Sequence, residues 1–193
     1  MKKVNMRSFV LASVFSAIIV LMTIIPYLGY ITYGPVEITT LHIVVIMGAV
    51  FLGPKYGALL GGVWGITCVA RAMIFAAANP VFEIFINPLV SLVPRILVGF
   101  VAGLVFYILK NKTKLGSIFS AAVSAVAGTF TNTLLVLSMM YIFSGMITSY
   151  SDIFELFKSI WLTLIGINGL IELVAAIIIV PAVYKSLEKT YRR

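Results

Sequence analysis

The chain has 193 residues, of which 62% are hydrophobic and only 10% are charged. Its mean hydropathy is +1.14. A soluble domain carries about 25% charged residues and keeps its apolar patches small, so this composition excludes a water-soluble fold. The sequence offers roughly six apolar segments that are long enough to cross a bilayer. We therefore predict an all-α integral membrane protein whose residues 1–193 form a single transmembrane domain.

The predicted membrane helices follow one another with polar connections between them. The longest of these connections cover residues 27–40, 76–87 and 144–157. The second helix is so short that it barely spans a bilayer. The six helices that we expect are Arg7–Ile25, Leu41–Leu52, Tyr56–Phe75, Pro88–Leu109, Ser117–Phe143 and Lys158–Tyr184.

Basic residues are divided unevenly between the two sides of this predicted topology. With the N-terminus in the cytoplasm, only Arg71, Arg95 and Lys158 fall in the membrane or on the outer side. Cytoplasmic loops carry the excess of lysine and arginine, so we expect both termini to be cytoplasmic. The net charge of +8 is therefore a topology signal and does not indicate nucleic-acid binding. The residues on the cytoplasmic side are Lys2, Lys3, Arg7, Lys55, Lys110, Lys112, Lys114, Lys185, Lys189, Arg192 and Arg193.

The sequence lacks the motifs of the common enzyme classes. It contains no Gly-x-x-x-x-Gly-Lys-Ser/Thr loop, which indicates that the chain does not hydrolyse ATP by itself. It shows no Ser/His/Asp or paired-carboxylate arrangement, so we do not expect an enzyme. A metal site would need several converging His, Cys or carboxylate ligands. The chain has one histidine and one cysteine, and we expect neither a metal nor a cofactor.

Two of the predicted helices carry small residues at helical spacing. In the first helix, two overlapping small-xxx-small pairs would let another helix approach closely. These pairs either pack inside the protein or form the contact face for a partner helix, and they consist of Ala12, Ser13, Ser16 and Ala17. In the third helix, one face predicts close packing because it carries Gly57, Gly61, Gly62 and Gly65.

A single arginine, Arg95, interrupts the apolar segment Asn87–Phe100. A charge near the middle of a spanning helix costs several kcal/mol by most estimates, so it needs a partner or a polar cavity. Proline removes a backbone donor, and we expect the helix to begin at Pro88 and to bend near Pro94. A buried cation in a proline-flanked helix start indicates a small-molecule site.

Polar residues of several helices fall at a similar depth in the outer half of the membrane. At about 1.5 Å per residue, Arg95 lies about 10–13 Å below the start of its helix. Asn132 and Asn168 fall near that depth, and Glu172 lies one turn deeper. We therefore predict a polar substrate pocket that opens to the outside. The residues that we assign to it are Arg95, Asn132, Asn168, Glu172, His42, Thr39, Asn87, Arg71 and Trp64.

Each of these assignments has a structural alternative. Arg95 pairs with Glu172 to hold two helices together, or Glu172 positions Arg95 for a ligand carboxylate, which suits the donor fork of arginine. His42 is more typical of a helix cap or an interfacial residue than of a ligand contact. Trp64 either stacks on a ligand or anchors the protein at the membrane interface. We interpret the loop carboxylate of Glu37 as solvated.

Three stretches of the sequence resemble one known family. They are Glu37–Ile43 with Thr-Thr-x-His, Leu52–Gly57 with Gly-Pro-Lys-Tyr-Gly, and Leu92–Gly99 with Val-Pro-Arg. On these stretches the chain is identified as a member of the substrate-binding S components of energy-coupling factor (ECF) vitamin transporters. The similarity covers essentially the whole chain. It is greatest to the pantothenate type, although Val44 stands where that pattern has proline.

The resemblance implies a function that the residues alone do not give. An S component of this kind binds a vitamin with high affinity from outside a bacterial cell. It then topples in the membrane, docked on a transmembrane coupling protein and two ATPase subunits, to release the vitamin inside. Its partners would be the vitamin, this ECF module and the lipid bilayer, and the small residues of the first helix would contact the coupling protein. Cobalamin, riboflavin or another vitamin is an alternative to pantothenate, and a membrane-embedded enzyme or an assembly factor is a more distant one.

Overall fold

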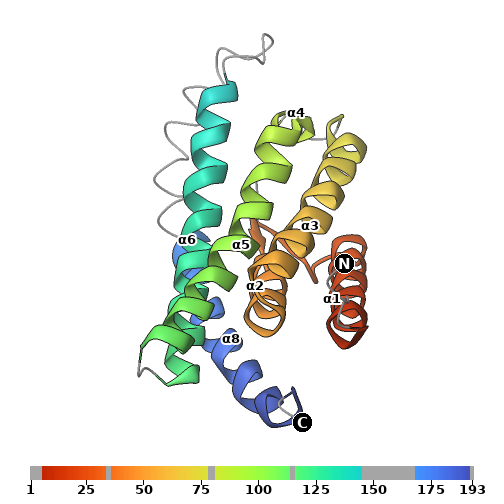
Figure 1. Ribbon diagram of the computed structural model, residues 1–193. Helices are drawn as coiled ribbons and strands as arrows, with labels where there is room; N and C mark the ends of the chain where they lie inside the picture. The colour runs from red at the N-terminus through yellow and green to blue at the C-terminus, as the bar shows by residue number, and fades with distance from the viewer. Residues whose placement is uncertain (1–5, 34–35, 78–80, 114–115, 145–167, 192–193) are drawn as a thin grey trace.

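The computed structural model describes residues 6–33, 36–77, 81–113, 116–144 and 168–191 (Figure 1). Its helices pack into a bundle, and a two-stranded hairpin connects the first helix to the second along the chain. The elements are α1 (Met6–Ile24), β1 (Tyr30–Tyr33), β2 (Val36–Thr39), α2 (Leu41–Leu52), α3 (Pro54–Phe75), α4 (Val81–Ile86), α5 (Pro88–Lys112), α6 (Ser117–Ser144) and α8 (Gly169–Tyr191).

Within the described residues, five helices are long and apolar enough to cross a membrane, and α2 is a shorter apolar helix. The prediction of an all-α membrane protein is thereby confirmed. The predicted sixth helix differs at its end, because α8 continues past Tyr184, and residues 158–167 of that prediction lie outside the described residues. The count of six spanning helices and the cytoplasmic location of both termini stay predictions.

The short helix α2 lies at the centre of the bundle. It contacts α1, α3, α5, α6 and α8. Most of its residues are buried, including the apolar run Ile43–Ile46, and they form the middle of the main hydrophobic core. A helix that is apolar all round is typical of such an interior position. The polar exception is His42, which the same packing buries completely.

Helices α3 and α5 run side by side because glycines bring their backbones together (Figure 1). A Cβ added to Gly57 would overlap the carbonyl oxygen of Gly99, and one added to Gly61 would overlap that of Arg95. A Cβ on Gly65 would lie 2.7 Å from a backbone atom of α5. Only glycine allows backbones to approach so closely. The predicted glycine face is therefore confirmed for these positions, and it fixes the backbone of Arg95 against α3.

The connection 27–40 contains an antiparallel hairpin that the sequence analysis did not predict. Both strands are rich in β-branched and aromatic residues, which is typical of strands. Tyr30 pairs with Thr39 across the hairpin. Because side chains alternate along a strand, Tyr30, Glu37 and Thr39 lie on one face. The connection 76–87 likewise contains an unpredicted element, the short helix α4.

Candidate functional site

Arg95 is the buried cation that the sequence predicts, with only 6% of its surface exposed. Its Nη1 donates a hydrogen bond of 2.8 Å to the carbonyl oxygen of Val90. Its Cζ lies 5.1 Å from the ring centroid of Trp64 and 5.6 Å from that of Phe85. The faces of aromatic rings attract a guanidinium group, so side chains of α3 and α4 help to hold this cation in place.

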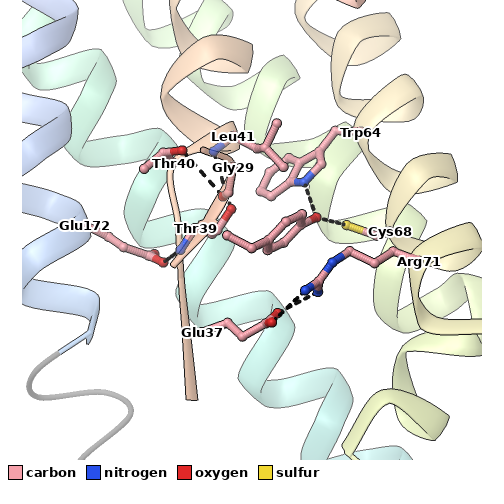
Figure 2. Close-up of polar contacts among 10 residues, drawn as sticks. Gly29, Glu37, Thr39, Thr40, Leu41, Trp64, Cys68, Arg71 and Glu172 are labelled. Carbon is pink, nitrogen blue, oxygen red and sulfur yellow. Dashed lines mark hydrogen bonds and ion pairs between the residues drawn. The ribbon is translucent and has the colours of Figure 1, made fainter. Parts of the chain in front are cut away.

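Trp64 is fully buried and connects Arg95 to the hairpin. Its Nε1 donates to the hydroxyl of Tyr30 at 3.1 Å, and that hydroxyl lies 3.1 Å from Sγ of Cys68 (Figure 2). Burial, reinforced by Cys68, raises the pKa of Tyr30 well above its usual range, so this hydroxyl keeps its proton. The interpretation of Trp64 as an interfacial anchor is therefore wrong.

Glu172 is buried near the start of α8, but it does not pair with Arg95. Its Oε1 accepts a hydrogen bond of 2.7 Å from the backbone N–H of Thr39 (Figure 2). Among the described residues, no ion pair joins Arg95 to a carboxylate. The alternative in which Arg95 and Glu172 form a direct ion pair is therefore wrong, although an electrostatic attraction between them remains. Glu172 instead holds the hairpin to α8.

Arg71 of α3 binds Glu37 of β2 and so holds the hairpin to α3. Its Nη1 and Nη2 each donate to one carboxylate oxygen of Glu37 at 2.7 Å (Figure 2). The Cζ of Arg71 also lies 4.2 Å from the ring centroid of Tyr30 and faces Phe75 and Phe82. Such a bidentate pair is among the stronger hydrogen-bonded arrangements in proteins. The interpretation of Glu37 as a solvated loop charge is therefore wrong.

Four buried polar side chains have atoms without a hydrogen-bond partner among the described residues. These atoms are both ring nitrogens of His42, Nε of Arg95, Oγ1 of Thr129 and Oδ1 of Asn132. Leaving such a group unpaired costs about 1–3 kcal/mol, so native proteins generally pair it with protein, water or ligand. His42 is fully buried, so it is not an interfacial residue, and it is not a cap because Thr40 occupies the N-cap of α2 and the ring nitrogens of His42 have no partner among the described residues. Both of these interpretations are therefore wrong. The four side chains are candidate ligand contacts.

Helix packing brings His42 and Asn132 to the same level of the bundle. A Cβ on Gly128 of α6 would lie 2.7 Å from Cδ1 of Ile46 on α2, so these two positions face each other. His42 precedes Ile46 by one turn, and Asn132 follows Gly128 by one turn. The two helices run in opposite directions, so both steps lead toward the hairpin end of α2.

Arg95, on α5, lies within about one helical turn of the level of His42 and Asn132. A Cβ on Gly128 would lie 3.2 Å from the Cβ of Ala102, which places these positions of α5 and α6 opposite each other. Helix α5 runs antiparallel to α6, and Arg95 lies two turns before Ala102. The cation therefore lies near the level of Asn132, as the depth argument predicts.

Glu172, on α8, also lies near the level of Asn132. A Cβ on Gly169 would lie 3.7 Å from Cγ2 of Thr133 on α6. Glu172 lies about one turn further along α8, and Asn168 immediately precedes the helix and is half-buried. The structure thus brings polar residues of α2, α5, α6 and α8 to neighbouring levels of the bundle.

The remaining predicted pocket residues take part in local hydrogen bonds. Asn87 caps α5, since its Oδ1 accepts from the N–H of Leu89 at 3.0 Å. Thr39 donates its N–H to Glu172, and its Oγ1 lies 3.4 Å from the N–H of Leu41 at the start of α2. Both residues therefore stabilise the ends of elements that carry the site.

The four small residues of α1 do not share one environment. Ala12 is 4% exposed and packs inside the bundle, and Ser16 is half-buried. Ser13 and Ala17 are exposed. Among the described helices, α1 packs mainly against α2 and α3. The opposite side of α1 faces away from these helices. The exposed Ser13 and Ala17 are the part of the motif that a partner helix can reach.

Sequence reasoning missed three residues near the site. Thr129 lies one turn before Asn132 on α6, and this spacing could have identified it, because residues three apart share a helix face. Tyr30 was visible only as an aromatic residue in a polar connection, since its role depends on the hairpin. Phe85 gives no such signal, because its contact with Arg95 depends on the path of α4.

The arrangement suits a small anion with several hydrogen-bonding groups. Arg95 supplies a cation with an unpaired N–H, and His42, Thr129 and Asn132 supply polar atoms without partners. Guanidinium groups bind carboxylates through charge-assisted hydrogen bonds, and amide and imidazole groups can both donate and accept. Within the described ranges, no three His, Cys, Asp or Glu side chains gather in a way that could hold a metal ion.

Comparison with known proteins assigns the chain to a family. The model of the family "ECF transporter, substrate-specific component" matches residues 7–184. The pantothenic acid transporter PanT of Lactococcus lactis subsp. cremoris is 30% identical over 98% of this chain and 97% of its own length. The pantothenate transporter PanT of Leuconostoc mesenteroides subsp. mesenteroides is 31% identical over 92% of this chain and 90% of its own length.

These matches agree with the apolar helices of the structure. The protein is a multi-pass bacterial cell-membrane protein and a transport subunit rather than an enzyme. The chain belongs to the family of ECF transporter substrate-specific components.

Proposed function

We propose that this chain is the pantothenate-binding subunit of a bacterial ECF importer. The observation that carries the proposal is the buried Arg95, whose unpaired Nε lies near the level of the unpaired His42 and Asn132. Pantothenate has a carboxylate at one end and an amide and hydroxyl groups along its length. The two relatives that are named pantothenate transporters support the same substrate.

Each group of this ligand has a suitable partner in the bundle. Arg95 binds the carboxylate, because a guanidinium fork matches the two carboxylate oxygens. The amide of Asn132 and the imidazole of His42 bind the ligand amide and hydroxyls, and Thr129 adds a hydroxyl on the same helix as Asn132. Asn168 contributes at the mouth of the site. Since hydroxyl and amide groups of the ligand pair with buried polar atoms, analogues that lack them bind weakly.

Membership of the family supports a transport cycle of the following kind. The subunit binds the vitamin in a pocket that opens to the outside, docks on a coupling protein with two ATPases, and topples to deliver the vitamin inside. The absence of a nucleotide-binding motif in the sequence supports a subunit that takes its energy from partner ATPases.

The test is calorimetry with pantothenate on the protein purified in detergent. Removing one member of a buried charged pair costs about 2–5 kcal/mol, so we expect Arg95→Ala to weaken binding by at least about 30-fold. Lys185→Ala removes an exposed cation of α8 and is the matched control, which should bind as the wild type does. An Arg95→Ala protein with unchanged affinity would contradict the site.

The substrate is tested separately from the site. Mass spectrometry of the small molecules that co-purify from vitamin-rich medium should find pantothenate. Detection of riboflavin or cobalamin instead, together with a wild type that gives no heat with pantothenate, would show that the subunit serves another vitamin.

A further inference from the structure

We infer that Pro94 is a positioning residue that holds the guanidinium of Arg95 with its Nε–Nη2 edge free for a ligand carboxylate. The inference rests on the proposed function, because it concerns how the same arginine meets an anionic ligand. It goes beyond that function because it gives Pro94 a role that acts through the backbone of α5.

Pro94 leaves one backbone carbonyl of α5 without its usual hydrogen-bond donor. In an α-helix, the N–H of each residue donates to the carbonyl oxygen four residues earlier. Pro94 lies inside α5 and has no N–H, so the carbonyl oxygen of Val90 loses its normal donor. Both Pro94 and Val90 are fully buried, and a buried carbonyl needs another partner.

Arg95 supplies that partner from the next position of the chain. Its Nη1 donates to the carbonyl oxygen of Val90 at 2.8 Å. A guanidinium is planar and rigid, so one such bond, together with the rings of Trp64 and Phe85, restricts the whole group. The neighbouring Pro94 therefore creates the acceptor that orients Arg95.

The orientation leaves the useful edge of the fork available. Nη1 is occupied by Val90, whereas the buried Nε has no partner among the described residues. Nε and Nη2 form a parallel pair of donors that matches the two oxygens of a carboxylate. A ligand carboxylate thus meets a donor pair that is already in place, which reduces the entropy cost of binding.

A residue with a backbone N–H at position 94 would compete with Arg95 for the carbonyl oxygen of Val90. Its N–H would bond to the carbonyl oxygen of Val90 and complete the helix ladder. Nη1 of Arg95 would then lose its exclusive acceptor, and the long side chain would regain rotamer freedom that binding must again restrict. The effect should fall on ligands with a carboxylate and spare neutral ligands of the same shape.

The experiment compares pantothenate with panthenol, its neutral alcohol analogue, by calorimetry on the full-length protein in detergent. We expect Pro94→Ala to weaken pantothenate binding by about tenfold or more, while panthenol affinity changes by less than about twofold. Pro181→Ala is the matched control, because Pro181 is also a buried proline inside a helix, α8, and lies far along the chain from Arg95. It should leave the ratio of the two affinities unchanged.

Pro94→Ser provides a second variant with a backbone N–H in case the alanine variant does not fold. An unchanged affinity for pantothenate in a folded Pro94 variant would overturn the inference. An equal loss of affinity for both ligands would also overturn it, because it would mean that Pro94 only shapes the helix. A wild type that binds neither ligand would instead contradict the proposed function itself.

Discussion

At the scale of single residues, Arg71 and Arg95 satisfy their charges in different ways. Arg71 meets the carboxylate of Glu37, and the pair ties the hairpin to α3. Arg95 meets a backbone carbonyl and two aromatic rings, which stabilise a cation without neutralising it. A cation whose charge is not cancelled attracts an anion more strongly. This difference supports our proposal that Arg95 binds the ligand, and it gives Arg71 a structural role.

The role of Arg71 predicts an energetic coupling with Glu37. We expect Glu37→Gln and Arg71→Met each to lower the free energy of unfolding, because each breaks the bidentate ion pair between these two half-buried side chains. In a double-mutant cycle, the coupling should be about 1–3 kcal/mol. Thermal unfolding of the four proteins in detergent measures it. Strictly additive effects would mean that the ion pair does not hold the hairpin.

The sequence predicts that Arg95 is a buried cation, but it does not predict which groups the residues around it contact. A charge in an apolar helix start has few physical explanations, so the cost of burying it is enough to predict a polar environment for Arg95 inside the bundle. The partners of Glu37, Trp64 and Glu172 depend on the hairpin reaching α3 and α8. Hydropathy says nothing about the rotation of a helix, and each of these contacts depends on that rotation.

At the scale of elements, glycine spacing decides how closely α3 and α5 pack. A Cβ on Gly61 would overlap the backbone of Arg95, whereas one on Gly62 would lie 3.8 Å from Ile96, an ordinary contact. We expect Gly61→Ala to lower the unfolding temperature in detergent and to weaken pantothenate binding, because α5 must move away from α3. Gly62→Ala is the matched control on the same helix and should leave both quantities near the wild-type values. Equal effects of the two variants would contradict this packing.

Long apolar runs predicted the helices well, because a spanning helix needs about 20 apolar residues and few sequences satisfy that by chance. The hairpin was missed for the opposite reason. Its strands Tyr30–Tyr33 and Val36–Thr39 are only four residues each, and isolated short hairpins are marginally stable in water. Contacts with α3 and α8 stabilise it, and those contacts are invisible until the bundle is assembled.

At the scale of the whole molecule, α1 is the least buried of the long helices that the structure describes. It lies at the edge of the bundle against α2 and α3, and it exposes large apolar residues such as Phe9, Val14 and Leu21 (Figure 1). Lipid covers such a surface, but lipid alone does not require small residues. Ser13 and Ala17, four residues apart on the exposed side, suit close approach of another helix.

We therefore expect Ala17→Leu to reduce co-purification with the coupling protein and the ATPases while leaving the affinity for pantothenate near the wild-type value. The added side chain would separate the two helices, and it lies on the outer side of α1, away from the polar residues of the bundle. Ala12→Leu should act differently, because Ala12 is buried and the larger side chain would disturb internal packing and lower the unfolding temperature. Ala182→Leu, at an exposed position of α8, controls for the added apolar bulk. Normal co-purification of the Ala17→Leu protein would mean that the coupling protein docks elsewhere, and a joint loss of docking and ligand affinity would mean that α1 supports the pocket.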